Sequence, residues 1–203
     1  MNRQLKIFIG IVIVTLLAAA VIVAALFMMD SRKDPGSSSE TIPGWEVFPA
    51  DQESARDRVT NEQYAFAAQA PDGWRAALLN STLVGIGRED FPECSMTLRL
   101  GSNDGLLSAS GLTEQLNPPG PKPQEKHRYV GTIVVGGWPA AVLTILGHLE
   151  NVTREVDIPK GDIIVIAEMS MKGLLNEQRN FVEHPRRKEC EDVFERFLGT
   201  FQI

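Results

Sequence analysis

The sequence has few of the residues that metal sites and active sites usually gather in clusters. Its 203 residues include 2 cysteines and 3 histidines, and the histidines, His127, His148 and His184, lie far apart. A transition-metal site normally needs several His, Cys or carboxylate ligands at short spacing, so we predict no metal site. A glycine-rich phosphate loop and a Gly-x-Ser-x-Gly elbow are also absent from the sequence. We therefore predict no catalytic residue and no cofactor, and a protein that is not an enzyme.

Positive charge is scarce beyond the first six residues. The chain has 20 basic and 26 acidic side chains, and Arg3 and Lys6 are the only charged residues before Asp30. The chain from Asp30 onward therefore has 18 basic and 26 acidic side chains, a net charge of −8. Such a domain is repelled by nucleic-acid backbones and by anionic lipid headgroups, so we expect no nucleic-acid partner.

A run of 23 uncharged residues, 7–29, follows the basic leader 1–6. As a helix it would be about 35 Å long, which spans a hydrocarbon core of ~30 Å with some tilt. Arg3 and Lys6 favour a cytoplasmic leader. We predict a single-pass anchor that crosses the lipid bilayer through residues 7–29 and places the following domain outside the cytoplasm, at the cell membrane.

A cleaved signal peptide is the main alternative for this run. Hydrophobic regions of signal peptides have roughly 7–15 residues. Ala18-Ala19-Ala20 resembles a cleavage site, but apolar residues continue for nine more positions. A core helix of a soluble protein is a further alternative. The run has no cysteine near its end, so lipoprotein processing is not predicted.

The remainder divides into a linker with a lead-in segment, 30–61, and an exported domain, 62–203. The linker has flexible Asp-Pro-Gly-Ser composition, and a short amphipathic helix is predicted over 51–59. In the domain, alternating or β-branched segments predict strands, which are 64–68, 74–79, 95–100, 130–135, 138–146, 152–158 and 163–171. Gly136-Gly137 predicts a hairpin between two of them. Helices are predicted over 105–116, capped by Asp104, and over 187–198. This order indicates an α+β fold, an antiparallel β-sheet with packed helices.

Cys94 and Cys190 are the two cysteines. Cys94 begins a predicted strand, and Cys190 belongs to the apolar stripe of helix 187–198, so both are expected inside the domain. An exported compartment permits disulfides, and we predict a Cys94–Cys190 bridge. A loop near 100 residues gives up to ~4.7 kcal/mol in the chain-entropy model. Two buried free thiols are the alternative, because free Cys is a common core residue.

Three tryptophans could line a ligand site, but their positions favour packing. Trp74 and Trp138 each open a predicted strand after a turn, so we predict core positions for both. Trp45 precedes the predicted domain and is expected either to pack on it or to contact a partner.

Five short segments follow one another between residues 62 and 203. They are Tyr64-Ala65-Phe66, Pro71-Asp72-Gly73-Trp74, the stretch from Val134 to Ala141, the long strand 163–171, and Phe197-x-x-Thr200-Phe201. In this order they resemble the PsbP-like fold family, which includes extrinsic photosystem proteins, a nuclear-import cofactor that binds the GTPase Ran, and bacterial envelope proteins. The exported setting looks most like the LpqN-type envelope proteins of actinobacteria, although the lipobox cysteine of those lipoproteins is missing here. The resemblance implies accessory and binding work, with no shared catalytic motif to transfer.

We therefore expect a membrane-anchored extracytoplasmic accessory or scaffold protein that binds membrane or envelope proteins without catalysis. The anchor would raise its effective concentration for partners at the membrane. The alternative is an envelope module that binds a small ligand between sheet and helices, and a hydrolase with an unrecognised site is a further one. A scaffold predicts exposed apolar surface, a ligand module a concave apolar cavity, and a hydrolase a Ser, Cys or His with a partner in that cavity.

Overall fold

The computed structural model describes residues 44–50, 56–120 and 124–203. The predicted leader and anchor, residues 1–6 and 7–29, and the linker up to residue 43 lie outside the described residues. Within the described ranges, no helix is long and apolar enough to cross a bilayer.

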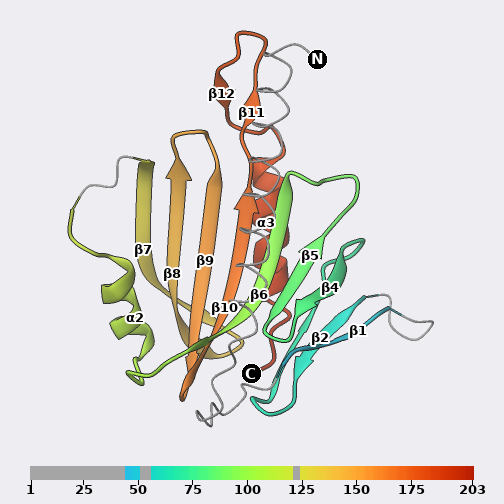
Figure 1. The fold of residues 1–203 in the computed structure, drawn as a ribbon, viewed down its shortest axis with the longest axis vertical. Coiled ribbons are helices and arrows are strands. Elements are labelled where there is room, and N and C mark those ends of the chain that lie inside the picture. The colour runs from blue at the N-terminus through green and yellow to red at the C-terminus, as the bar shows by residue number, and fades with distance from the viewer. Residues whose placement is uncertain (1–43, 51–55, 121–123) are drawn as a thin grey trace, which may run out of the picture. The chain divides into compact units, whose positions relative to one another are not determined.

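A seven-stranded antiparallel sheet forms the centre of the fold (Figure 1). Its strands, from one edge to the other, are β4 (Arg75–Asn80), β5 (Leu83–Gly87), β6 (Cys94–Ser102), β10 (Ile163–Met171), β9 (Val152–Lys160), β8 (Trp138–Gly147) and β7 (Glu125–Val135). Five short strands form two smaller sheets, β1 (Glu46–Phe48), β2 (Arg58–Asn61) and β3 (Phe66–Gln69) in one, β11 (Leu174–Leu175) and β12 (Phe181–Val182) in the other. The described helices are α2 (Ala109–Leu116) and α3 (Arg187–Leu198). The prediction of an α+β fold with antiparallel sheets is confirmed.

The two helices lie on opposite faces of the large sheet (Figure 1). The disulfide of Cys190 joins α3 to β6 on the face that carries Met96 and Leu98. On β8, Ala141 and Leu143 project to the other face and are nevertheless buried. Their cover is α2, which contacts β7, β8 and β9. The outer face of β4, β5 and β6 therefore lies beyond both helices.

The main hydrophobic core lies between the sheet and α3. It is formed by the apolar residues that alternate with polar or less buried ones along the strands. In β6 and β10 every second residue is buried, and in α3 the buried positions recur at helical spacing. This is the pattern of a sheet with one face against a helix. The strand predictions for β6, β8, β9 and β10, the helix 187–198 and the hairpin at Gly136-Gly137 are confirmed.

The predicted Cys94–Cys190 disulfide is present. The two Cα atoms are 5.9 Å apart, and the bond links the first residue of β6 to α3 across 96 residues. Both residues are fully buried. The alternative of two free thiols is thereby contradicted.

Two helix predictions need correction. The helix predicted over 105–116 begins only at Ala109, and its N-cap is Ser108 rather than Asp104. Leu106 has a φ of +47° and is 70% exposed, so the chain cannot run helically through it. From Arg58 onward, the described part of the lead-in segment is strand β2, not helix.

The burial of the three tryptophans differs in part from the prediction. Trp74 is buried as predicted, but Trp138, the first residue of β8, is 38% exposed, and Lys160 Nζ lies 5.5 Å from its ring centroid. Trp45 packs on the domain. Its ring lies edge-on to Phe66 with centroids 5.2 Å apart, and its indole N–H donates to the carbonyl of Thr82 at 3.2 Å. The folded domain therefore includes described residues that precede position 62.

Candidate functional site

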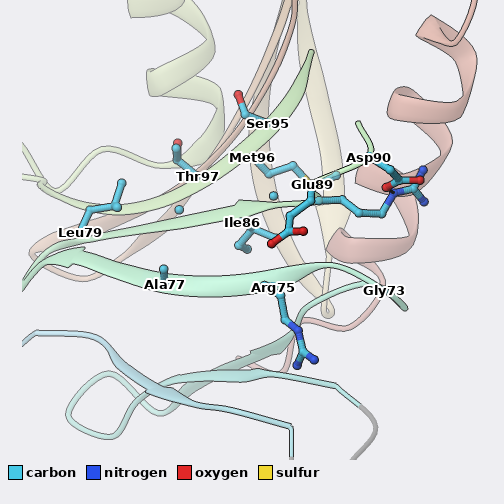
Figure 2. Close-up of a pocket in the computed structure, with 13 residues that line it drawn as sticks. Gly73, Arg75, Ala77, Leu79, Ile86, Glu89, Asp90, Ser95, Met96 and Thr97 are labelled. Carbon is cyan, nitrogen blue, oxygen red and sulfur yellow. Dashed lines mark ion pairs between the residues drawn. The ribbon is translucent and has the colours of Figure 1, made fainter. Parts of the chain in front are cut away.

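An open groove of about 940 Å³ lies on the outer face of β4, β5 and β6 (Figure 2). Outer here means the face that is turned away from α3. Ser95 and Thr97 of β6 line the groove, and they alternate with the buried Cys94, Met96 and Leu98. The groove is therefore built from the strand positions that the main core leaves unused.

Two glycines form the floor of the groove. Of the outward positions of β5, Leu83, Gly85 and Gly87, the two glycines line the groove, so within the groove this strand presents only its backbone. Gly85 lies opposite Ala77 of β4 on one side and Thr97 of β6 on the other. A β-carbon added at Gly87 would meet no atom within 4 Å, whereas one at Gly85 would lie 3.1 Å from Leu79 Cδ1. Glycine in a strand often marks a place where another backbone or a ligand approaches closely.

The two walls of the groove differ in character. On β4 the wall is formed by Ala77, by Leu79, which is 60% exposed, and by Arg75, so it is apolar at 77 and 79 and cationic at 75 (Figure 2). On β6 it carries the hydroxyls of Ser95 and Thr97, and Glu89 from the loop after β5 lies at one end (Figure 2). Neighbouring strands are ~4.8 Å apart, so the backbones of β4 and β6 are separated by roughly 10 Å.

A buried carboxylate holds the β4 wall in place. Asp57 is 3% exposed, and its two oxygens accept the backbone N–H groups of Ala50 at 2.7 Å and Ala76 at 2.8 Å. Arg75 pairs with it at 3.2 Å. Burial by itself would raise the pKa of Asp57, but these hydrogen bonds and the guanidinium outweigh it, and the pKa lies below its ordinary value.

An acidic row adjoins the groove on the same face of the sheet. Glu168 of β10 lies opposite Thr97 on one side and Glu155 of β9 on the other. Asp157 follows two residues after Glu155 and therefore projects to the same face. Arg99 of β6 pairs with Glu155 at 3.1 Å. We call Glu155, Asp157 and Glu168 the acidic row, which holds three carboxyl groups beside one guanidinium.

Burial and mutual repulsion alter the acidity of this row. Burial, followed by the charge of Glu155, raises the pKa of Asp157 to about 7, and the nearby guanidinium of Arg99 offsets only part of this. The same two causes raise the pKa of Glu168. A carboxyl group that loses water without gaining hydrogen bonds favours its neutral form.

None of the three histidines belongs to the groove lining. His127 and His148 are exposed, and His184 is buried, where its Nδ1 accepts the N–H of Arg186 at 3.1 Å. No histidine lines the groove beside Ser95 and Thr97. In the part of the chain that the structure describes, no group of three His, Cys, Asp or Glu side chains could hold a metal ion.

Comparison with known proteins gives fold-level likeness only. No protein-family model matches the chain, and no curated protein matches it. A solution structure of cyanobacterial PsbP (CyanoP) from Synechocystis is similar at 7% identity and a TM-score of 0.44, over 84% of this chain and 98% of that one. A crystal structure from Bacteroides thetaiotaomicron is similar at 9% identity and a TM-score of 0.41, over 80% of this chain and 48% of that one. We draw no functional conclusion from either likeness.

Sequence reasoning missed both the groove and the acidic row. The segment Leu83–Gly87 was not predicted as a strand, because its two glycines weaken the β pattern. The signal that was available is the alternation of glycine with Val84 and Ile86, which marks a strand with one bare face. For the acidic row, the signal was Glu155 and Asp157 alternating with Val156 and Ile158.

Proposed function

We propose that this protein is a membrane-anchored extracytoplasmic accessory protein that binds an extended segment of a partner protein in the groove on β4, β5 and β6. The observation that carries the proposal is the open groove itself, with a backbone floor at Gly85 and Gly87 and the exposed Leu79 on its β4 wall, on a sheet face that neither α2 nor α3 covers. No catalytic step is proposed.

An extended segment fits the shape of this surface. A small molecule is usually held in a cavity that buries 70–90% or more of its surface, whereas this groove is open to solvent in front of Gly87. A β-carbon at Gly87 would meet no atom within 4 Å, so an extended chain can approach the backbone of β5 there. Leu79, 60% exposed on the wall, would lose its contact with water when the segment binds.

The N-terminal run supports the membrane setting of the proposal. Residues 7–29 are long enough to span a bilayer, and an anchored domain meets partners in the same membrane at raised effective concentration. The acidic domain would not bind anionic headgroups by charge, so we propose membrane or envelope proteins as the partners. On the resemblance in its sequence, we propose an envelope protein of PsbP-like type, in a setting like that of the LpqN-type proteins.

Site-specific photocrosslinking of the full chain in its native membranes tests this function. A photoreactive phenylalanine analogue replaces Ala77 in the groove wall, and a matched protein carries it at Thr132, which is exposed on β7. We expect adducts with membrane or envelope proteins from position 77 and not from position 132. The Gly87→Leu change places a side chain in the groove at a position where a β-carbon meets no atom within 4 Å, and it should abolish those adducts, whereas Thr132→Leu should not.

Two results would contradict the proposed function. One is the absence of any protein adduct from position 77 while the chain remains folded and membrane-bound. The other is an adduct pattern that Gly87→Leu leaves unchanged, because the partner would then lie outside the groove.

A small-ligand module is the second candidate, and the groove volume favours it. About 940 Å³ falls within the ~300–1,000 Å³ range of small-molecule sites. Native mass spectrometry of the protein extracted in mild detergent separates the two functions. A bound apolar molecule that Gly87→Leu removes would support the ligand module, and a protein adduct from position 77 supports the accessory role.

A further inference from the structure

The acidic row is continuous with the groove. Thr97 lines the groove, Glu168 lies beside it on the next strand, and Glu155 lies one strand further. Each strand step is ~4.8 Å, so a long side chain from a segment over β5 can reach Glu168 across β6. The row and the groove thus form one surface that a single partner segment can touch.

Asp157 is the carboxyl group of this surface that has a buried oxygen without a hydrogen-bond partner among the described residues. The residue is only 5% exposed, and the oxygen is its Oδ1. A buried carboxyl group without a partner is costly, and it favours any added donor, most of all a cationic one. This oxygen projects from the face that carries Glu155 and Glu168.

The nearby guanidinium does not balance the row. Arg99 pairs with Glu155 at 3.1 Å, and among the described residues no ion pair joins it to Glu168 or Asp157. One positive charge therefore faces three carboxyl groups. A metal ion is a poor match, because no suitable group of three ligands exists in residues 44–50, 56–120 and 124–203.

We propose that the acidic row receives an arginine or lysine side chain of the partner segment that lies in the groove. This inference rests on the proposed function and narrows it, because the partner becomes an extended segment with apolar residues over β5 and a basic residue beyond Thr97. The row would select a basic side chain over a neutral one, because a basic side chain forms charge-assisted hydrogen bonds with the carboxylates.

The same surface makes binding depend on pH. The groups that face Asp157 are Glu155 on its own strand, Glu168 on β10 and Arg99 on β6. The helix α2, which contacts β9, has Glu114 as its only charged residue, and Glu114 is exposed. A bound cation favours the ionised row, so binding releases protons, and the affinity rises with pH through about 7.

Peptide selection on the full chain tests the inference without knowledge of the natural partner. Phage-displayed random nine-residue peptides are selected on the protein in lipid nanodiscs, with Gly87→Leu protein as the counter-target. We expect the selected peptides to carry Arg or Lys at one fixed position. Their affinity should fall about tenfold or more in Glu155→Gln/Glu168→Gln protein, and equally when citrulline replaces the arginine of the peptide. Glu114→Gln/Glu177→Gln is the control with the same change in net charge.

The outcomes separate the two proposals. Groove peptides without an enriched basic position, or with unchanged affinity in Glu155→Gln/Glu168→Gln protein, overturn this inference and leave the proposed function standing. If no selected peptide distinguishes the protein from Gly87→Leu, both proposals fail. For the pH dependence, the affinity of a basic peptide should rise between about pH 6 and pH 8, and Asp157→Asn should flatten that rise. An equal rise in both proteins removes Asp157 from the site.

Discussion

The carboxylate of Asp57 accepts the backbone N–H of Ala76 at 2.8 Å, and this bond ties the segment before β2 to β4, the edge strand of the large sheet. Its other oxygen accepts the N–H of Ala50 at 2.7 Å. Because Ala76 neighbours Ala77 in the groove wall, the wall is positioned by a residue that lies outside the seven-stranded sheet.

Replacement of Asp57 should destabilise the protein. Asp57→Ala leaves two backbone donors without their acceptor, and we expect a loss of about 1–3 kcal/mol in the free energy of unfolding. Urea unfolding followed by circular dichroism measures it. Arg75→Ala is the control, because it removes only a largely exposed guanidinium. If both variants lose the same small amount, the backbone bonds do not hold β4.

The same carboxylate predicts a loss of stability in acid. The pKa of Asp57 is lower in the folded protein than its ordinary value of 3.8, so its contribution is present above 3.8 and disappears as the pH falls through the folded pKa. The stability difference between the protein and Asp57→Asn should therefore shrink below about pH 4. A difference that stays constant from pH 7 to pH 3 would contradict this.

The disulfide should contribute about 2–4 kcal/mol, because it closes a loop with a sequence separation of 96. We expect Cys94→Ser/Cys190→Ser and the chemically reduced protein to unfold at similarly lowered guanidinium concentrations. Measurements with and without reductant give both values. The double variant must be insensitive to reductant, and equal stability of all forms would show that the bridge contributes nothing.

Asp157 predicts the opposite pH dependence from that of Asp57. Its folded pKa of about 7 lies above the ordinary 3.8, so the folded state holds a proton that the unfolded chain has released. Stability is therefore lost as the pH rises from about 4 to about 7, by up to about 4 kcal/mol. Asp157→Asn should be more stable than the parent above pH 7 and similar to it near pH 4. Parallel stability curves for the two proteins would contradict this.

The hairpin glycines Gly136 and Gly137 should respond differently to substitution. Their φ angles are +56° and +86°, a region that asparagine tolerates better than alanine. A β-carbon at Gly136 would lie 2.7 Å from the carbonyl oxygen of Phe201, whereas one at Gly137 meets nothing within 4 Å. We expect Gly137→Asn to cost less than ~1 kcal/mol and Gly136→Asn more than ~2 kcal/mol. Thermal unfolding of the two variants measures these losses of stability. Equal losses would rule out the close approach of residue 136 to Phe201.

The local sequence pattern was enough to predict those strands and helices in which one side is clearly more apolar than the other. The alternation in β6, the long apolar run of β10, the apolar stripe of α3 and the paired glycines at 136 and 137 each predicted the observed structure. The disulfide followed from the same reasoning, because Cys94 and Cys190 each occupy an inward position of a regular element. The short strands β1 and β2 carried too few residues to show a period, and a helix was wrongly predicted over part of β2.

The sequence by itself determined which side of each long strand and of α3 is apolar, because side-chain periodicity is a local property of the chain. Only the tertiary structure decided what covers each side. It left Trp138 exposed at the start of β8. It made a groove of Gly85 and Gly87 by placing β4 and β6 on either side of them, and it joined Glu155 to Glu168 through strand register. These relationships link residues that are distant in the chain. The local sequence pattern of one strand does not specify which other strand pairs with it.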